Sequence, residues 1–142
     1  MEHETNKLSK DELVMVRDGA PSDFPFIMST WLKGLRFGNS WFSFIPSGIY
    51  YKFYSKVIET LLYQERTKVK IACLKDDPDV ILGYSVFSDT SIHWAFVKKA
   101  WRKIGIANSI VPNGVATVTH LTDVGKAICK NKGFTFNPFE IN

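Results

Sequence analysis

The period of the apolar residues changes partway along this chain, and this change restricts the fold more than any other feature. Between residues 24 and 62, apolar side chains recur every three or four positions, which is the period of an amphipathic helix. From residue 68 to residue 97 the period is two, which is typical of β-strands. Short polar turns at 76–79 and 88–90 divide this part into three strands, with Gly83 indicating a bulge or a close approach in the second. Separate helical and strand blocks predict an α+β domain with an antiparallel meander.

Two helices are predicted before the meander, each with one apolar face. Ser22 and Asp23 precede the first helix, and Pro46 and Ser47 open the second. We expect the aromatic residues on these helical stripes to pack in the core: Phe24, Trp31, Tyr50, Phe53 and Tyr54.

The other predicted elements are shorter. A first strand is expected at 13–16, a short helical stretch after Gly105 that Pro112 ends, a fifth strand at 115–119, a last helix that ends near Gly133, and a final strand at 134–136. The predicted order is therefore β-α-α-β-β-β-α-β-α-β in a single domain over 1–142, with a polar tail at 1–12.

Composition and charge exclude several classes of protein. A net charge of +4 is below that of a dedicated DNA-binding domain, although it suits a protein that meets an anionic ligand. Cys73 and Cys129 have no spacing typical of a disulfide framework or a metal site. The polar first ten residues, and an uncharged run at 37–51 that is too short to span a bilayer, predict no membrane segment. We therefore expect a cytoplasmic protein that binds no metal.

A basic loop lies between the fourth predicted strand and the short helix that follows. It contains Lys98, Lys99, Arg102 and Lys103, and Gly105 stands where the helix begins. Unpaired backbone N–H groups and the helix dipole at such a point favour phosphate, and glycine lets a pyrophosphate approach the backbone. A solvated turn is the alternative.

The segment Arg102-Lys103-Ile104-Gly105-Ile106-Ala107 after the fourth strand resembles the acyl-CoA-binding signature of the GCN5-related N-acetyltransferase (GNAT) superfamily, Arg/Gln-x-x-Gly-x-Gly/Ala. Lys132-Gly133-Phe134 resembles the ending of that family's last helix. The order of elements also matches, so the resemblance covers roughly residues 13–136. The small size and short loops resemble the family's bacteriophage members.

The resemblance implies a mixed, mostly antiparallel sheet whose fourth and fifth strands splay apart around acetyl-CoA, the acyl donor. The strand would offer backbone groups to the pantetheine arm, and the loop and helix would wrap the pyrophosphate. The residues that this implies at the cofactor are Trp94, Ala95, Phe96, Val97, Lys98, Lys99, Arg102, Lys103, Ile104, Gly105, Ile106 and Ala107.

The resemblance also implies catalytic positions, at which this chain departs from the family pattern. Where the family often has a tyrosine that protonates the leaving thiolate, this chain has Cys129, and Thr122 replaces an early asparagine of the same helix. A glutamate of the fourth strand often acts as the base, and here His93 and His120 are the candidates because a histidine suits that task. The alternative for each of Cys129, His93 and His120 is a packed structural residue.

Aromatic residues make up 14% of the chain, and Trp41, Phe42 and Phe44 stand together between the two predicted helices. In the resembled family this region closes over the acyl acceptor, so these rings are candidate substrate-binding residues. A hydrophobic plug of the core or a homodimer surface explains them equally well.

Three functions follow from these observations. The first is transfer of an acetyl group to an amine of a small molecule, a peptide or a host protein, by direct attack in a ternary complex. The second is a catalytically degenerate GNAT-fold module that binds a protein, such as a phage protein acting on a host factor in the host cytoplasm. The third, nucleic-acid binding through the basic loop and Trp101, is disfavoured because a CoA phosphate loop explains the same cluster better.

Overall fold

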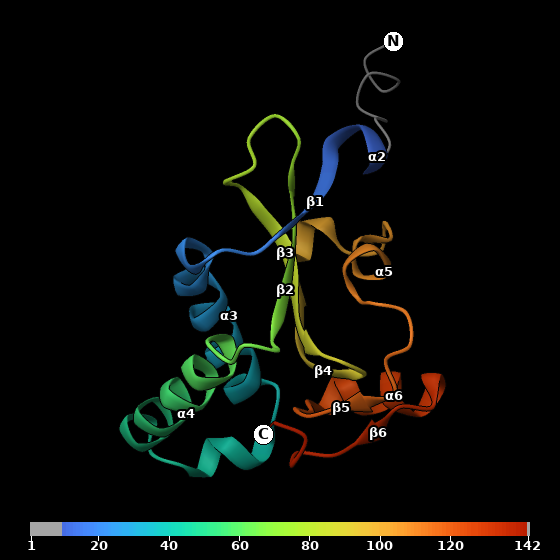
Figure 1. Ribbon diagram of the computed structural model, residues 1–142. Helices are drawn as coiled ribbons and strands as arrows, with labels where there is room; N and C mark the ends of the chain where they lie inside the picture. The colour runs from blue at the N-terminus through green and yellow to red at the C-terminus, as the bar shows by residue number, and fades with distance from the viewer. Residues whose placement is uncertain (1–9, 142) are drawn as a thin grey trace.

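The computed structural model describes residues 10–141, apart from the side chains at 10, 123–125 and 127, and Figure 1 shows its elements. The helices are α2 (Lys10–Leu13), α3 (Phe24–Phe37), α4 (Ser47–Leu62), α5 (Ile106–Ile110) and α6 (Asp123–Lys132). The strands are β1 (Val14–Asp18), β2 (Lys68–Leu74), β3 (Ile81–Ser88), β4 (Ser91–Val97), β5 (Thr117–Val118) and β6 (Thr135–Phe136). Three 3₁₀ turns complete the order: η1 (Pro21–Asp23), η2 (Ser40–Phe44) and η3 (Lys99–Trp101).

The six strands form one mixed sheet in the order β1-β2-β3-β4-β5-β6. The first four are antiparallel to their neighbours, whereas β5 runs parallel to both β4 and β6. Helices α3 and α4 lie on one side of the sheet and α5 on the other, while α6 lies beside β5 and β6 (Figure 1). The predicted α+β class, the mostly antiparallel mixed sheet and the predicted order of elements are confirmed.

The core has two parts, one on each face of the sheet. Under α3 and α4, Trp31, Tyr50 and Tyr84 are almost fully buried. Under α5, Ile106 and Ile110 pack against residues of β1, β2 and β3, namely Val14, Ala72 and Leu82. Apolar residues at the helical and strand periods thus meet across the sheet, as the pattern predicts.

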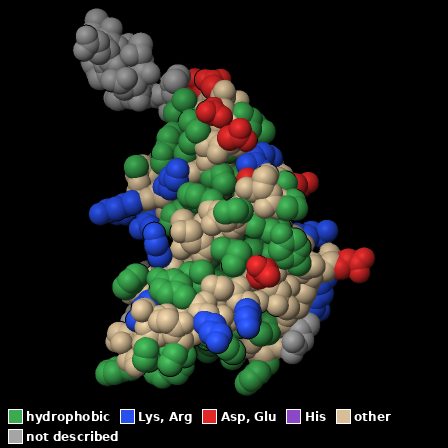
Figure 2. Space-filling view, turned by 90° about the vertical axis from the view of Figure 1, so that its left-hand side faces the viewer, with side chains coloured by type: hydrophobic (Ala, Val, Ile, Leu, Met, Phe, Trp, Pro, Cys, Tyr) green, Lys and Arg blue, Asp and Glu red, His purple; other side chains and the backbone are tan. Residues whose placement is uncertain are grey.

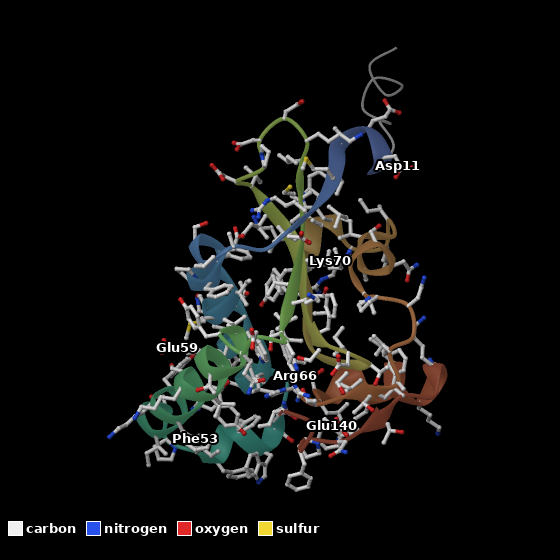
Figure 3. All side chains as sticks on the ribbon, in the orientation of Figure 1. Asp11, Phe53, Glu59, Arg66, Lys70 and Glu140 are labelled. Carbon is white, nitrogen blue, oxygen red and sulfur yellow. The ribbon has the colours of Figure 1, made fainter. Side chains whose placement is uncertain are left out.

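Four expectations about individual segments are corrected. Residues 10–12 belong to α2 rather than to a tail, because the Lys75 amide donates to the Leu13 carbonyl at 2.9 Å and ties this turn to the sheet. The first strand extends to Asp18, which is opposite Lys70. The fifth strand has only two residues. Phe53 is 61% exposed, on the side of α4 that faces away from the sheet (Figure 3). The buried face of α4 contains Tyr50 and Tyr54, which are one helical turn apart, and Phe53 lies outside it.

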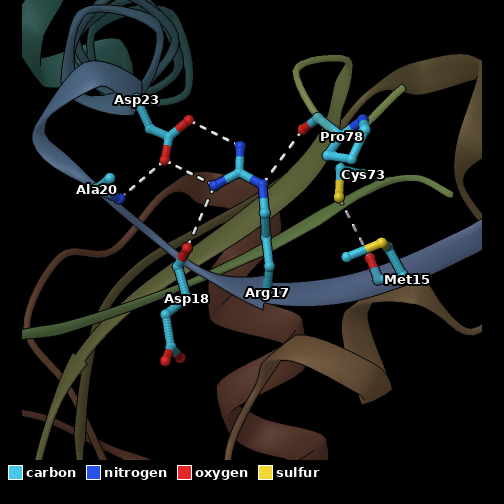
Figure 4. Close-up of polar contacts among 7 residues, drawn as sticks. All are labelled: Met15, Arg17, Asp18, Ala20, Asp23, Cys73 and Pro78. Atoms are coloured by element: carbon cyan, nitrogen blue, oxygen red, sulfur yellow. Dashed lines mark hydrogen bonds and ion pairs between the residues drawn. The ribbon is translucent and has the colours of Figure 1, made fainter. Parts of the chain in front are cut away.

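An ion pair fastens the entry to α3 onto the sheet (Figure 4). Arg17 on β1 donates to both carboxylate oxygens of Asp23 at 2.8 and 2.9 Å, and to the carbonyls of Asp18 and Pro78 at 3.2 Å. Asp23 also accepts the Ala20 amide at 2.8 Å. The hydrogen bonds from Arg17 hold the pKa of Asp23 below its usual value. The bidentate pair thereby joins β1, η1 and the turn between β2 and β3.

Replacement of Asp23 by Asn should lower the free energy of unfolding by about 2 kcal/mol, because it removes charged hydrogen bonds. A carboxylate whose folded pKa is depressed stabilises the fold above its unfolded pKa, near 4, and loses that effect as the pH falls. The parent should therefore lose stability below about pH 4 more steeply than Asp23→Asn, as urea unfolding at a series of pH values would measure. Asp18→Asn is the matched control, since Arg17 contacts only the Asp18 carbonyl in this cluster, and an equal loss in that variant would contradict the assignment.

Candidate functional site

Strands β4 and β5 pair over two residues and then diverge. Ser91 is opposite Thr117 and Ile92 is opposite Val118, and the Thr119 amide donates to the Ile92 carbonyl at 3.1 Å. β4 continues to Val97, whereas β5 ends at Val118. The predicted splay of the fourth and fifth strands therefore opens beyond Ile92, and α5 and α6 lie on either side of it (Figure 1).

The register of β4 decides which of its backbone groups face the splay. The Lys98 amide donates to the Leu82 carbonyl at 2.8 Å, and backbone direction alternates along an antiparallel strand. Phe96 and Trp94 therefore direct their amides and carbonyls to β3, whereas Ala95 and Val97 direct theirs into the splay. Ala95 is exposed, although it lies in a strand between two neighbours in the sheet order. Of the four predicted strand contacts, two are thus available through the backbone.

The basic loop follows this strand and makes a tight turn into α5. Lys103 has φ of 67° and Gly105 has φ of 91°, so two left-handed residues turn the chain. Arg102 donates through Nε to the Val97 carbonyl at 2.9 Å, and Lys99, Arg102, Lys103 and Ile104 are exposed. Ile106 is buried in the core, and the Lys98 ammonium lies 5.5 Å from the centre of the Phe26 ring on the α3 side. The exposed cations are therefore Lys99, Arg102 and Lys103.

His93 occupies a bulge in β4. Val86 is opposite Trp94 and Phe87 is opposite Ile92, so His93 is the extra residue between them. Its side chain is 1% exposed, and both ring nitrogens have partners: Nε2 lies 2.9 Å from Ser88 Oγ and Nδ1 lies 2.8 Å from Thr119 Oγ1. Thr119 Oγ1 is also 3.0 Å from Nδ1 of His120. The two candidate histidines, 27 positions apart in sequence, are linked through one hydroxyl.

Both histidines are neutral at physiological pH. Burial lowers the pKa of His93 to about 4, with the positive charge of Arg66 adding to the effect. Burial also lowers the pKa of His120 to about 4; the charge of His93 adds to this effect, and a hydrogen bond with the His93 backbone opposes it. Each ring can therefore accept a proton at neutral pH, but a lasting imidazolium is disfavoured at either position.

Helix α3 closes one side of this region through aromatic contacts. Trp31 stacks on Trp94 with centroids 5.9 Å apart and planes at 8°, and His120 meets Trp31 edge-on at 5.3 Å. A Cβ at Gly34 would lie 2.7 Å from Trp94 Cζ2, and one at Gly38 would lie 2.7 Å from Thr122 Cγ2. Two glycines of the α3 end thus permit its close approach to β4 and to the start of α6, a requirement that the sequence analysis missed.

The remaining candidates are placed on α6 and η2. Cys129 on α6 is partly exposed and free, and burial raises the pKa of its thiol, so it is protonated at neutral pH. Trp41 and Phe44 are 65% and 86% exposed. Phe42 is buried, in edge contact with Tyr50 and Tyr54 at 5.4 and 5.3 Å. The aromatic block therefore divides into one core residue and two surface residues.

An apolar and basic surface surrounds these two rings. Figure 2 faces α3 and α4, and in its lower half hydrophobic and basic side chains predominate while acidic ones are scarce. The sequence has no Asp or Glu between residues 24 and 58. The large exposed apolar residues of this segment are Phe37, Trp41, Phe44, Ile49 and Phe53.

The part of the chain that the structure describes lacks two other kinds of feature. No helix over residues 10–141 combines the length and the apolar character that crossing a membrane requires. Within the same described residues, no three His, Cys, Asp or Glu side chains gather as metal ligands would.

Known structures share this architecture. The fold is similar to a putative acetyl transferase from Pyrococcus furiosus, with 18% identity and a TM-score of 0.53 over 85% of this chain and 77% of that one. It is also similar to a possible acetyltransferase from Clostridium difficile 630, with 15% identity and a TM-score of 0.55 over 89% of this chain and 93% of that one. No family model matches the sequence, and no curated protein matches it either. The chain has the GNAT fold.

Replacement of Gly34 by Ala should destabilise the protein by about 1–2 kcal/mol, because the new methyl group displaces Trp94 from its stack on Trp31. The matched control is Gly48→Ala in α4, where an added Cβ meets nothing within 4 Å and should raise stability slightly. Urea unfolding gives the stabilities, and near-ultraviolet circular dichroism should change in Gly34→Ala alone. Equal effects of the two substitutions would show that the close approach of α3 has no energetic weight.

Proposed function

We propose that this protein is an acyl-CoA-dependent N-acyltransferase that transfers an acetyl group from acetyl-CoA to an amine. The observation that carries the proposal is the splay itself. β4 leaves β5 after Ile92, the backbone groups of Ala95 and Val97 are directed into the gap, and a basic, left-handed turn follows at the end of the same strand. An extended pantetheine arm needs such unpaired strand groups, and its pyrophosphate needs such a turn.

The residues present fit this cofactor. The amide of Val97 and both backbone groups of Ala95 would bind the pantetheine in the manner of an added strand. Backbone N–H groups around Gly105, together with Lys99, Arg102 and Lys103, would bind the phosphates. The bond from Arg102 to the Val97 carbonyl holds the turn against the strand end. The bound thioester supplies an activated acyl carbon.

The chemistry would be direct attack of the amine on that carbon. His120, with His93 behind it, is the candidate acceptor of the amine's proton because burial keeps both rings neutral. Cys129 is the candidate donor to the leaving thiolate, and its raised pKa keeps the thiol protonated. The exposed rings of Trp41 and Phe44 would contact the acceptor, and the surrounding basic surface favours an acceptor with acidic groups nearby.

The cellular setting belongs to the same proposal. Cys73 and Cys129 are both free thiols, which is in keeping with a reducing cytoplasm. A homodimer through the exposed rings of η2 and α4 is the competing use of that surface, and the size of the protein in solution would distinguish the two.

Isothermal calorimetry with acetyl-CoA tests the proposal. The parent should bind, and Gly105→Glu should weaken binding by at least ~10-fold, about 1.4 kcal/mol, because the new carboxylate repels the phosphates and strains the left-handed turn. Binding should also weaken as salt is raised, since exposed cations contribute.

Gly133→Glu is the matched control, since Gly133 also has positive φ, at 73°, and lies beyond α6 with open space around it. It should bind acetyl-CoA as the parent does. Absence of binding by the parent would refute the enzyme hypothesis and favour the degenerate binding module. Undiminished binding by Gly105→Glu would refute the assigned phosphate turn.

A further inference from the structure

A continuous chain of side-chain hydrogen bonds crosses the sheet from β2 to the candidate site. Thr67 Oγ1 lies 3.4 Å from Ser88 Oγ, and Ser88 Oγ lies 2.9 Å from His93 Nε2. His93 Nδ1 lies 2.8 Å from Thr119 Oγ1, which lies 3.0 Å from His120 Nδ1. Every member of this chain can both donate and accept a hydrogen bond.

The members of this hydrogen-bonded series are buried in the middle and partly exposed at both ends. The three middle members are sealed from solvent, with Ser88 and Thr119 each 2% exposed and His93 1% exposed. The two ends, Thr67 and His120, are only partly buried. Thr67 precedes β2 and His120 follows β5, so the ends are separated by three strand spacings, about 14 Å. The position of Arg66, next to Thr67, marks the first end in Figure 3.

We propose that these five side chains, which we name the Thr67–His120 relay, carry a proton between the candidate acyl-transfer site and solvent. This inference rests on the proposed function and adds to it a route for the proton of the acceptor amine. One hydrogen-bond polarity satisfies the whole chain: each of His120, Thr119, His93 and Ser88 donates to the next, toward Thr67. In this polarity Nδ1 of His120 carries the hydrogen, and its Nε2 has the lone pair that can accept a proton.

The transfer balances in protons and bonds. As the amine forms its C–N bond, it gives one proton to His120 Nε2, and each donor in turn passes its own hydrogen to its neighbour until Thr67 releases one to water. The C–S bond breaks, and Cys129 protonates the thiolate. The chain then has the opposite polarity. A proton that enters from water at Thr67 passes back along the chain, and the one that His120 Nε2 releases replaces the proton that Cys129 gave up. Both the polarity of the chain and the Cys129 thiol are thereby restored.

The relay explains how so weakly basic a ring can act. Burial disfavours the imidazolium form of both histidines, so a base that had to store the proton would be poor. A ring that releases a proton from Nδ1 as Nε2 receives one remains neutral. The β4 bulge is a requirement, because it places His93 between the hydroxyls of two neighbouring strands.

Exchange of the His93 ring proton with water tests the relay in the free protein, by nuclear magnetic resonance on histidine-labelled chain. In the parent this buried proton should exchange at least ~10-fold faster than the backbone amides of Val86 and Trp94. These two residues are opposite each other on β3 and β4 next to His93, and their amides exchange only when the sheet opens locally. In Ser88→Ala/Thr119→Val both hydroxyl links are lost, and the ring proton should exchange as slowly as those amides.

Two variants keep this test decisive. Thr119→Ser retains the hydroxyl and should keep fast exchange, as should Thr117→Val, the same methyl-for-hydroxyl change two residues earlier. If the double variant does not fold, Thr119→Val alone should still slow exchange relative to Thr119→Ser. Parent exchange as slow as the Val86 and Trp94 amides, or equal rates in Thr119→Val and Thr119→Ser, would overturn the relay.

Turnover with acetyl-CoA and the dipeptide Trp-Glu, an amine that carries an aromatic ring and acidic groups, provides the second measurement. Thr119→Val should lower kcat at least ~10-fold with unchanged acetyl-CoA binding, and Thr119→Ser should recover it. The dependence of kcat on the deuterium fraction of the solvent should be curved in the parent, since several protons move together, and linear in Thr119→Val. A parent that binds no acetyl-CoA would refute the proposed function alone, because the exchange measurement still decides the relay.

Discussion

The short pairing of β4 with β5, together with the bulge at His93, sets the geometry of the whole site. Two residues of parallel pairing hold the strands together at one end, and within residues 10–141 no pairing of β4 with β5 continues beyond Ile92. The backbone of β4 that β5 leaves unpaired keeps its hydrogen-bonding groups, which are costly to bury without partners. An extended ligand laid along the gap satisfies them. The bulge acts at the other end, where β4 and β5 are paired. It places His93 between the hydroxyl of Ser88 on β3 and that of Thr119, the residue after β5.

Helices on opposite faces of the sheet support the region where β4 and β5 diverge. On one face α3 approaches closely enough for Trp31 to stack on Trp94 and contact His120, and Gly34 makes that approach possible. On the other face the short α5 buries Ile106 and Ile110, which anchors the basic turn directly after β4. Arg17 and Asp23 fasten the start of α3 to the sheet edge. Contacts at both ends of α3 therefore set the position of Trp31 against Trp94. The site is therefore held by α3 on one face of the sheet and by α5 on the other.

The secondary structure of residues with a regular apolar period was predicted well. The contacts of residues that depend on a partner far away in the sequence were not predicted. The helices with Trp31 and Tyr50 and the three meander strands follow from period and turn chemistry, because burial on one face imposes that period. Phe53 was misplaced because a stripe of aromatic residues wider than the buried face has members on its flank. The β5 strand was predicted too long, since its apolar content does not reveal that β4 diverges from it. His93 and His120 were singled out separately, and nothing in their spacing indicates that Thr119 joins them.

Four features follow from the amino-acid sequence: the order of elements, the α+β class, the basic turn at the end of β4 and the resemblance to an acyl-CoA-binding signature. These are local properties: apolar period, turn residues, and a run of charges beside Gly105. Which of these groups meet depends on the tertiary structure. It sealed His93 between Ser88 and Thr119, turned the backbone of Ala95 and Val97 toward the splay, and separated Phe42 from Trp41 and Phe44. The physical reason is that strand register, bulges and helix approach distances depend on contacts between segments far apart in the chain, which no local pattern encodes.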